Sequence, residues 1–441
     1  MRLHGESAWE YLERIPSYSR KKSSLEVVRK FLDRLGNPDR SFQILHVAGT
    51  NGKGSTCAML TSCLTEAGYL VGTFVSPHLV DIRERFLMNG EMVSHDMFDE
   101  AFETVYAQIP EWIESGNLHP TYFEFLFYMA MVLFRRAGVS IVVLETGMGG
   151  RYDVTNVIEK PLVSVITSIS IDHTAFLGDT REAIATHKAG IIKRDRPVVY
   201  DGYCEEVNPV IESYAAQTGS RCHRVKDVAY EYQKGKLKIC IPYCGVDEEF
   251  MIPFSAPYQA RNAALAIKAL EVSELSVKPD ILKAGIRKTR WAARMEEILP
   301  GVYLDGAHNE DGIREFLKAA HMICDANSHH AVPAARSKTW LLFAVSDDKE
   351  YKEMLKRIAE ALKPDICMLS SMESYRSLSM DELEKTAAAI MDERTEIRCF
   401  TQVAEAMKEL LSDKSEGDVA FIAGSLYLAG EIKAVLEEKH D

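Results

Sequence analysis

The chain has 441 residues, a formal net charge of −13, 46% hydrophobic residues and 27% charged residues. This length suits two domains, and the composition is that of a globular protein in water. The acidic balance argues against nucleic acid as a partner, and we expect neither a membrane span nor a secretory signal. The nine cysteines are scattered without metal-ligand spacing, so reduced thiols and a cytoplasmic location are expected.

A glycine-rich turn between an apolar run and a helical run is the most informative pattern in the chain. Residues 42–48 are mostly apolar, residues 49–56 read GTNGKGST, and residues 57–67 have helical periodicity. Glycines let backbone N–H groups converge on phosphate oxygens, and a helix N-terminus adds partial positive charge. Lys53 supplies a mobile cation for the outer phosphates. The pattern predicts a nucleotide-phosphate site made of Thr50, Asn51, Gly52, Lys53, Gly54, Ser55 and Thr56.

This turn differs from the common P-loop. The common pattern has Gly six residues before the lysine and Ser or Thr directly after it, whereas Val47 and Gly54 stand there in this chain. A tight strand-to-helix turn with a surface lysine is the structural alternative to a phosphate site.

Strand-like and helix-like runs alternate along most of the first 200 residues. Such alternation predicts a mostly parallel sheet with helices on both faces. Between residues 224 and 253, short alternating segments suggest a small antiparallel sheet instead. The strands are expected at 70–75, 139–144, 162–166 and 197–200, and the helices at 122–136 and 181–189, the second capped by Asp179 or Thr180.

A second α/β series begins near residue 302. Its strands are expected at 302–304, 339–345, 365–369, 395–400 and 418–423. A helix at 402–411 is expected to bury Ala404, Met407 and Leu411. Residues 325–338 are expected to form an exposed loop, whose pair His329 and His330 is not expected to bind a metal. A boundary at residues 294–300 gives domains of residues 1–296 and 297–441.

Ionisable side chains follow two strands of the first series that are consecutive in the sequence. In a parallel sheet, ligands bind at the carboxyl ends of the strands. Glu145 ends one strand beside three glycines, where a carboxylate can hold Mg²⁺ against phosphates. His173 follows the next strand, and Lys188 ends the helix after it, the usual place for a lysine that complements the helix dipole. These positions alone leave a structural role open for all three residues.

The string HVAGTNGKGST at residues 46–56 resembles the signature of folylpolyglutamate and dihydrofolate synthases, a branch of the Mur ligase superfamily. Further segments resemble signatures of that family in the same order, so the resemblance covers about residues 40–431. It implies an α/β fold with an N-terminal, mostly parallel P-loop-type ATPase domain like the central Mur ligase domain, and a smaller Rossmann-like C-terminal α/β domain. The further segments are SPH, GMGGRYDVTN, DHTAFLGDT, HKAGIIK, QARNAA, WAARME, DGAHNE and GSLYL.

The resemblance also implies a magnesium site. The serine of the family's SPH segment, here Ser76, joins the equivalents of Glu145 and His173 as metal ligands. The family's lysine that matches Lys188 is carbamylated by CO₂ and becomes an anionic metal ligand. Oxygen ligands with one imidazole are chemically reasonable for Mg²⁺. The chain departs from the family at His187, where Glu is usual.

The substrate contacts are likewise implied by the resemblance. ATP would also meet Asn262, Arg294 and Asp305, and the catalytic residues would be Lys53, Lys188 and His308. Departures from the family at Met148, Tyr152 and Val154 bear on the folate pocket. Folate would meet Arg83, Thr121, Tyr122, Phe123, Glu124, Tyr152, Asp153 and Val154, and glutamate would meet Asp305, His308 and Ser425.

We therefore expect a monomeric ATP-dependent ligase that extends a folate with glutamate through an acyl phosphate. Its partners would be ATP, Mg²⁺ and small-molecule substrates. Residues 18–28, which replace a PGLERI-like run of the family, give no indication whether it also joins dihydropteroate to glutamate. A Mur-type ligase acting on a UDP-linked cell-wall precursor and a non-catalytic nucleotide-binding switch are the alternatives. The forms GTNGKGST and DGAHN favour a folate substrate.

Overall fold

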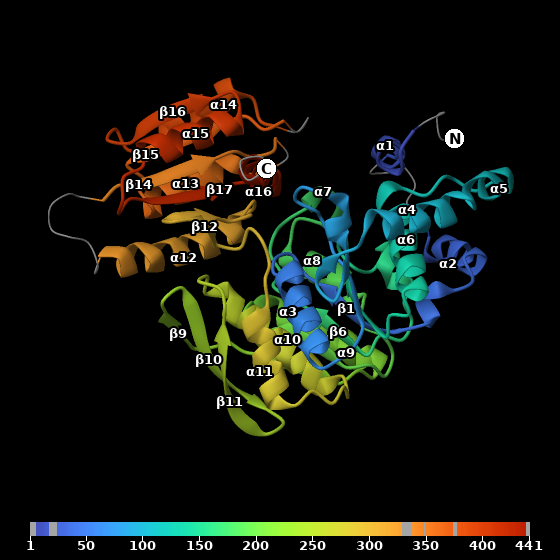
Figure 1. Cartoon of the computed structure of the whole chain (residues 1–441). Coiled ribbons are helices and arrows are strands. Elements are labelled where there is room, and N and C mark those ends of the chain that lie inside the picture. Colours follow the sequence, from blue (N-terminus) through green and yellow to red (C-terminus); the bar gives the residue numbers. More distant parts are fainter. Residues whose placement is uncertain (1–5, 17–23, 329–336, 348, 374–376, 438–441) are drawn as a thin grey trace. The chain divides into compact units, whose positions relative to one another are not determined.

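The computed structural model describes residues 6–16, 24–328, 337–347, 349–373 and 377–437 (Figure 1). The chain divides into two compact units. Unit 1 comprises residues 1–228, 240–250 and 261–289, and unit 2 comprises residues 229–239, 251–260 and 290–441. Most of the N-terminal run noted above (residues 18–23) and the pair His329 and His330 lie outside the described residues.

An eight-stranded sheet forms the centre of unit 1, in the order β4-β3-β2-β5-β1-β6-β7-β8. Six neighbouring strands from β2 to β8 run parallel, and the short strands β3 and β4 complete one edge in antiparallel pairs. The strands are β1 (Gln43–Ala48), β2 (Val71–Phe74), β3 (Phe86–Met88), β4 (Glu91–Met92), β5 (Ile141–Glu145), β6 (Val163–Ile166), β7 (Val198–Asp201) and β8 (Cys222–Val225).

Helices cover this sheet because its parallel strands are apolar on both faces; β5 and β6 are buried at every residue. Helices α2, α4 and α6 pack into one aromatic-rich core, and α8 and α9 into another. Helix α3 packs against α11 and the strands β1, β2 and β5. The helices are α1 (Ala8–Arg14), α2 (Leu25–Arg34), α3 (Lys53–Glu66), α4 (His95–Tyr106), α5 (Ile109–Glu114), α6 (Tyr122–Arg136), α7 (Thr174–Leu177), α8 (Arg181–Ala189), α9 (Asn208–Thr218), α10 (Tyr258–Val272) and α11 (Pro279–Lys288).

A six-stranded sheet with its own core forms unit 2, in the order β12-β13-β17-β14-β15-β16. Strands β12 and β13 pair antiparallel, and the other described neighbours in this sheet pair parallel. The strands are β12 (Glu296–Leu299), β13 (Val302–Leu304), β14 (Thr339–Phe343), β15 (Ile366–Ser370), β16 (Glu396–Phe400) and β17 (Val419–Ala423). The helices are α12 (Glu310–Ser328), α13 (Tyr351–Ala361), α14 (Met380–Ile390), α15 (Val403–Asp413) and α16 (Leu426–Glu437).

A third sheet contains β9 (Tyr230–Gln233), β10 (Lys236–Tyr243) and β11 (Val246–Ile252). Strands β9 and β10 pair antiparallel, which confirms the antiparallel segment expected there. The α/β fold class and the parallel sheet are also confirmed. Helix α8 begins after Thr180, whose hydroxyl accepts a hydrogen bond from the N–H of Ala183, as the capping prediction required.

Three local predictions are wrong. The helix after the glycine turn begins at Lys53 rather than Cys57, because Gly52 is its N-cap. Helix α12 continues to Ser328, so residues 325–328, which we expected in a loop, are helical. Helix α15 buries Val403, Ala406, Met407 and Leu410, whereas Ala404 and Leu411 are exposed. Its apolar stripe starts one residue earlier than we expected, and the stripe still has the i, i+3, i+4, i+7 spacing.

Phe102 tests the aromatic core of unit 1. Its fully buried ring stacks on Tyr106 and lies 5.5 Å from the rings of both Tyr11 and Phe125. Phe102→Ala should lower the free energy of unfolding by about 3–5 kcal/mol, because it leaves a cavity among these rings. Urea denaturation measures this change. Met92→Ala, at a half-exposed position, is the control, and equal losses in the two variants would contradict this account.

Candidate functional site

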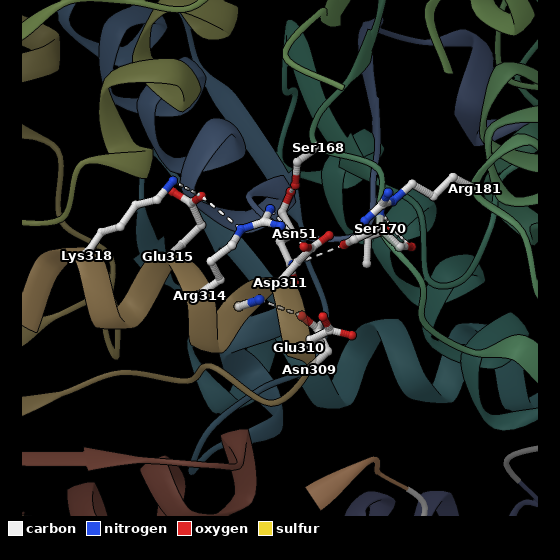
Figure 2. A network of polar contacts seen from close by, with 12 residues as sticks. Asn51, Ser168, Ser170, Arg181, Asn309, Glu310, Asp311, Arg314, Glu315 and Lys318 are labelled. Carbon is white, nitrogen blue, oxygen red and sulfur yellow. Dashed lines mark hydrogen bonds and ion pairs between the residues drawn. The ribbon is translucent and has the colours of Figure 1, made fainter. Parts of the chain in front are cut away.

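The glycine turn is tied to the strand next to it. Strands β1 and β6 are parallel neighbours, so the turn after β1 lies beside the loop that follows β6. The N–H of Thr50 donates to the carbonyl of Ser168 at 2.7 Å, and the Thr50 hydroxyl donates to the carbonyl of Ser170 at 3.1 Å. The amide of Asn51 donates to the Ser170 hydroxyl at 3.3 Å (Figure 2). These bonds fix the turn before any ligand binds.

Two positions of the turn accept only glycine. At Gly49, a Cβ atom would lie 1.7 Å from Oγ1 of Thr167. Gly52 has φ +87°, and a Cβ atom there would lie 2.4 Å from Oδ1 of Asn262. The turn is therefore packed against the end of β6 on one side and against α10 on the other. Asn262, predicted to meet the nucleotide, is thus placed beside the turn.

Lys53 is the first residue of α3 and points back over the turn. Its ammonium group donates to the carbonyl of Thr50 at 3.1 Å and lies 3.8 Å from Oε1 of Glu145. Gly54, Ser55 and Thr56 form the rest of the first helical turn, and the N–H of Thr56 donates to the carbonyl of the N-cap residue Gly52 at 3.0 Å. A cation beside such a helix N-terminus is suited to a polyphosphate.

Glu145 ends β5 and is buried, with 2% of its surface exposed. Its Oε2 accepts a hydrogen bond from the backbone N–H of Ser76 at 3.3 Å. Strands β2 and β5 are parallel neighbours, which explains why the segments after them meet. The structure thus brings together three predicted site residues, Lys53, Glu145 and Ser76, from the ends of three adjacent strands.

Lys188 lies in the last turn of α8 and is only 3% exposed. The loop after β5 covers this turn, because the N–H of Arg151 donates to the carbonyl of His187 at 2.7 Å. Burial lowers the pKa of the Lys188 amine well below its usual range, and the charge of Lys53 lowers it further, whereas Asp172 and Asp153 oppose the shift. A buried amine of this kind favours the neutral, nucleophilic form.

His173, the remaining predicted metal ligand, is exposed and stands just before α7, with φ +52° in the left-handed region. Within the described residues, no three His, Cys, Asp or Glu side chains lie close enough to hold a metal ion. The predicted donors are the buried carboxylate of Glu145, the hydroxyl of Ser76 and the exposed imidazole of His173. This set fits Mg²⁺, which keeps several waters and uses one or two carboxylates together with substrate phosphates.

Several of the predicted folate residues have intramolecular partners. Thr121 and Glu124 form the capping box of α6. Asp153 accepts hydrogen bonds from the N–H groups of Met148 and Thr155. Arg83 forms an ion pair with Asp81. These contacts fix the loops that carry the predicted folate residues. Val154 is buried, whereas Tyr152 is 60% exposed and available to a ligand.

Helix α6 begins with two aromatic residues, Tyr122 and Phe123, that the sequence predicted to contact folate. The ring of Phe123 lies against Gly147 and 5.6 Å from the ring of Phe74. The guanidinium of Arg85 lies 5.6 Å from the ring centre of Tyr122. The sequence predicted Arg83 as a folate ligand, whereas the arginine beside the ring of Tyr122 is Arg85.

His78 is a further residue that sequence reasoning left without a role. Its Nδ1 accepts a hydrogen bond from Nε of Arg85 at 2.8 Å. Burial and the Arg85 charge lower the pKa of His78 to about 4, so the ring is neutral at pH 7. The sequence contained a signal for His78, because this residue belongs to the SPH segment that also contains the predicted metal ligand Ser76.

Unit 2 has its own cluster at the carboxyl end of β13. The buried carboxylate of Asp305 accepts hydrogen bonds from the Tyr258 hydroxyl at 2.7 Å, the Met295 N–H at 2.8 Å and the Ala307 N–H at 2.9 Å. Burial raises the pKa of Asp305, and the nearby Arg294 guanidinium opposes this shift. Because Asp305 accepts the hydrogen bond from the N–H of Met295, it holds the backbone next to Arg294. Arg294 is one of the residues that the sequence predicted to bind ATP.

His308 and Ser425 lie on the same edge of unit 2. Strands β13 and β17 are parallel neighbours, and the N–H of Gly424 donates to the carbonyl of Ala307 at 3.0 Å. Ser425 is buried and its hydroxyl accepts from the N–H of Tyr427. Nδ1 of His308 lies 2.8 Å from the carbonyl oxygen of Gly306. The three residues predicted for glutamate thus gather in one place.

Two segments of the chain match models of Mur ligase domains. Residues 47–270 match the Mur ligase middle domain, and residues 293–426 match the glutamate ligase domain of Mur ligases. The helices that the structure describes include none with the length and apolar character of a membrane span.

Known proteins resemble the chain over nearly its whole length. It is 33% identical to the dihydrofolate synthase/folylpolyglutamate synthase of Bacillus subtilis, over 94% of this chain and 95% of that protein. It is 31% identical to a probable dihydrofolate synthetase of Schizosaccharomyces pombe, over 94% and 98%. The structure of E. coli FolC in complex with DHPP and ADP superposes with a TM-score of 0.82 at 26% identity, covering 100% of both chains. The chain belongs to the folylpolyglutamate synthase and dihydrofolate synthase family.

Lys53→Ala should abolish turnover and leave the fold intact, because a lysine in the first turn of a helix, outside the apolar core, contributes little to stability. We expect the rate to fall by far more than tenfold, a barrier change above ~1.4 kcal/mol. Steady-state ADP release and circular dichroism measure the two properties. Lys30→Ala, an exposed lysine on α2, is the control. Turnover within tenfold of the parent would rule out the assigned role of Lys53.

Glu145→Gln and His173→Ala should each raise the Mg²⁺ concentration needed for half-maximal activity at least tenfold, because each removes a proposed metal ligand. A magnesium titration of activity at saturating ATP measures this. Glu91→Gln, an exposed acid on β4, should match the parent. If the titration curve of either site variant overlays that of the parent, the residue concerned is not a ligand.

Proposed function

We propose that this chain adds L-glutamate to folates in an ATP-dependent reaction and acts as a folylpolyglutamate synthase. It is an ATP-dependent ligase of the family identified above. The observation that carries the proposal is the meeting of Lys53, Glu145 and Ser76 beside a glycine turn, at the ends of adjacent parallel strands. A switch protein has no need for the additional glutamate-ligase domain.

The proposed reaction has two steps. An oxygen of the folate γ-carboxylate attacks the γ-phosphorus of ATP, the bond to the β,γ-bridging oxygen breaks, and ADP leaves. The amine of glutamate then attacks the carbonyl carbon of the acyl phosphate, loses a proton and expels inorganic phosphate. Phosphorylation is needed because a carboxylate oxygen is a poor leaving group. Lys53 and Arg294 would neutralise charge on the transferring phosphoryl group.

We propose that Ser76, Glu145, His173 and a modified Lys188 hold Mg²⁺ here. Bound Mg²⁺ supplies charge neutralisation at the β- and γ-phosphates. The protein's own part is to fix the donors: the N–H of Ser76 orients the Glu145 carboxylate, and the helix end places Lys188. Because Glu145 also lies near Lys53, one carboxylate links the phosphate turn to the metal donors.

Lys188 is proposed to carry a carbamate. Its neutral amine nitrogen attacks the carbon of CO₂ and loses a proton, which converts the buried amine into an anionic carbamate with two oxygens. The lowered pKa of the amine supports this step, since only the neutral amine is nucleophilic. As an anion, the side chain would be compatible with both Lys53 and a metal.

The two domains are proposed to bind different substrates. We propose that residues 1–296 bind ATP and folate and that residues 297–441 bind glutamate through Asp305, His308 and Ser425. We further propose that the protein acts as a cytoplasmic monomer on small molecules, without nucleic acid or membrane partners. Folate would contact Tyr122, Phe123 and Tyr152, whose rings can stack on a pterin.

Purified protein with ATP, Mg²⁺ and glutamate tests the function. Tetrahydrofolate should give products larger by successive glutamate residues, resolved by mass spectrometry. Dihydropteroate in a parallel reaction tests the dihydrofolate synthase activity that the names of two relatives include. A UDP-linked peptide precursor tests the Mur alternative, and product from it alone would overturn the proposal. ADP release that does not depend on glutamate would instead indicate a switch.

Lys188→Ala should lose activity, and acetate should restore part of it by supplying a carboxylate in the vacated space. Lys188→Arg keeps a cation but cannot form the carbamate, so it should be as inactive as Lys188→Ala. Activity with and without acetate is the measurement, with the exposed Lys160→Ala as control. An active Lys188→Arg variant would show that a cation suffices and that no carbamate is needed.

A further inference from the structure

His46 is a polar residue within the buried part of β1, and the reaction proposed above assigns it no role. Its side chain is fully buried, and its Nε2 lies 2.9 Å from Oγ1 of Thr155. Burial lowers the pKa of His46 to about 3, and the charge of Lys193 lowers it further, so the ring is neutral at pH 7. A buried polar ring is costly unless its hydrogen bonds are made, so the contact with Thr155 needs an explanation beyond packing.

The direction of the hydrogen bonds follows from the next residue in the chain of contacts. The Thr155 hydroxyl donates its single proton to Oδ1 of Asp153 at 2.6 Å. The hydroxyl must therefore accept from His46, so Nε2 of the imidazole carries the ring proton. Nδ1 then has only a lone pair, and it has no hydrogen-bond partner among the residues that the structure describes. The bonds run one way, from the imidazole through the hydroxyl to the carboxylate.

Asp153 in turn holds the loop after β5. Its Oδ1 also accepts from the N–H of Thr155 at 3.0 Å, and its Oδ2 accepts from the N–H of Met148 at 2.9 Å. These bonds span most of residues 147–156, which we call the cover loop because the N–H of Arg151 is bonded to the last turn of α8. The orientation of the Asp153 carboxylate therefore sets the path of the cover loop.

A second polar residue of the sheet holds the end of α8. Ser164 on β6 is the partner in register of His46, so the two side chains lie on the same face of the sheet. The Ser164 hydroxyl donates to the carbonyl of Ile191 at 2.9 Å, just after α8. The side-chain amide of Asn156 donates to one carbonyl of the cover loop at 3.0 Å and to the carbonyl after α8 at 3.1 Å. Thus β1 anchors the cover loop, β6 anchors the helix end, and Asn156 joins the two.

We propose that His46 is a positioning residue, which acts through Thr155 and Asp153 to hold the cover loop in its place over the end of α8. The proposal rests on the proposed function, because the cover loop carries Tyr152 and Asp153, which we expect to contact folate. The phosphate turn has its own bonds to the segment after β6 and does not depend on this chain of contacts. His46 should therefore affect the folate substrate and not ATP.

Trypsin cleavage after Arg151, an exposed residue of the cover loop, reports on the loop without any measurement of activity. We expect His46→Leu and Thr155→Val each to speed this cleavage about tenfold relative to cleavage after Lys226, which is exposed in unit 1 outside the loop. His46→Gln, whose amide can supply an N–H near the position of Nε2, should keep the parent's rate. Tyr243→Phe removes another buried hydrogen bond of unit 1 and is the matched control.

The double variant tests whether His46 acts through Thr155. If it does, His46→Leu combined with Thr155→Val should be cleaved after Arg151 no faster than Thr155→Val alone, because the chain of bonds is already broken. In steady-state kinetics, His46→Leu should raise the KM for tetrahydrofolate about tenfold and leave the KM for ATP within about twofold of the parent's. His46→Gln should restore the KM for tetrahydrofolate.

Four results would overturn the proposal. Unchanged cleavage after Arg151 in His46→Leu would show that the loop does not depend on the imidazole. Equal acceleration after Arg151 and Lys226 would show that the whole unit is weakened. Effects that multiply in the double variant would show that His46 and Thr155 act separately, and an equal rise in both KM values would show that the phosphate turn is distorted as well. A parent that does not turn over folate would instead refute the proposed function, and the cleavage experiment would still decide the role of His46.

Discussion

The hydrogen bonds between the turn after β1 and the segment after β6 are the constraint on which the candidate site depends. Thr50 and Asn51 are bonded to Ser168 and Ser170 at several atoms. A flexible glycine turn would lose much conformational entropy on binding phosphates. Here that entropy is already lost on folding, so the N–H groups and Lys53 are in place for a ligand.

Parallel strand order accounts for the rest of the arrangement in unit 1. Lys53, Glu145 and Ser76 are far apart in sequence, yet they follow β1, β5 and β2, which are neighbours in the sheet. One edge of one sheet therefore carries the residues that we propose for phosphates and for a metal. In the six-stranded sheet of unit 2, Asp305 and Ser425 likewise follow two parallel strands that are neighbours in the sheet, β13 and β17.

The sequence predicted those parts that depend on local pattern. The glycine turn, the strand before it and the Thr180 cap are determined by neighbouring residues, and the structure has them close to the expected positions. The strand-end position of Glu145 followed from the α/β alternation, whereas β6 ends at Ile166 and His173 stands directly before α7. The start of α3 was misjudged because Lys53 and Gly54 look like loop residues, although Gly52 already caps the helix.

Features that depend on long-range packing could not be predicted in this way. Lys188 reads as a solvent-facing lysine at a helix end, and its burial arises from the loop after β5, which packs on that helix end. Choosing between Arg83 and Arg85 required knowing that Asp81 pairs with the first. The three partners of Asp305 come from separate segments, so its role in holding the Arg294 backbone was also hidden.

The central claim is that this site activates a carboxylate by transferring a phosphoryl group to it. Tetrahydrofolate labelled with ¹⁸O in both oxygens of its γ-carboxylate tests this directly during turnover with ATP and glutamate. The account predicts that one labelled oxygen appears in inorganic phosphate and the other stays in the amide product. Unlabelled phosphate formed together with the amide would contradict it, because the carboxylate oxygen would then never have been bonded to phosphorus.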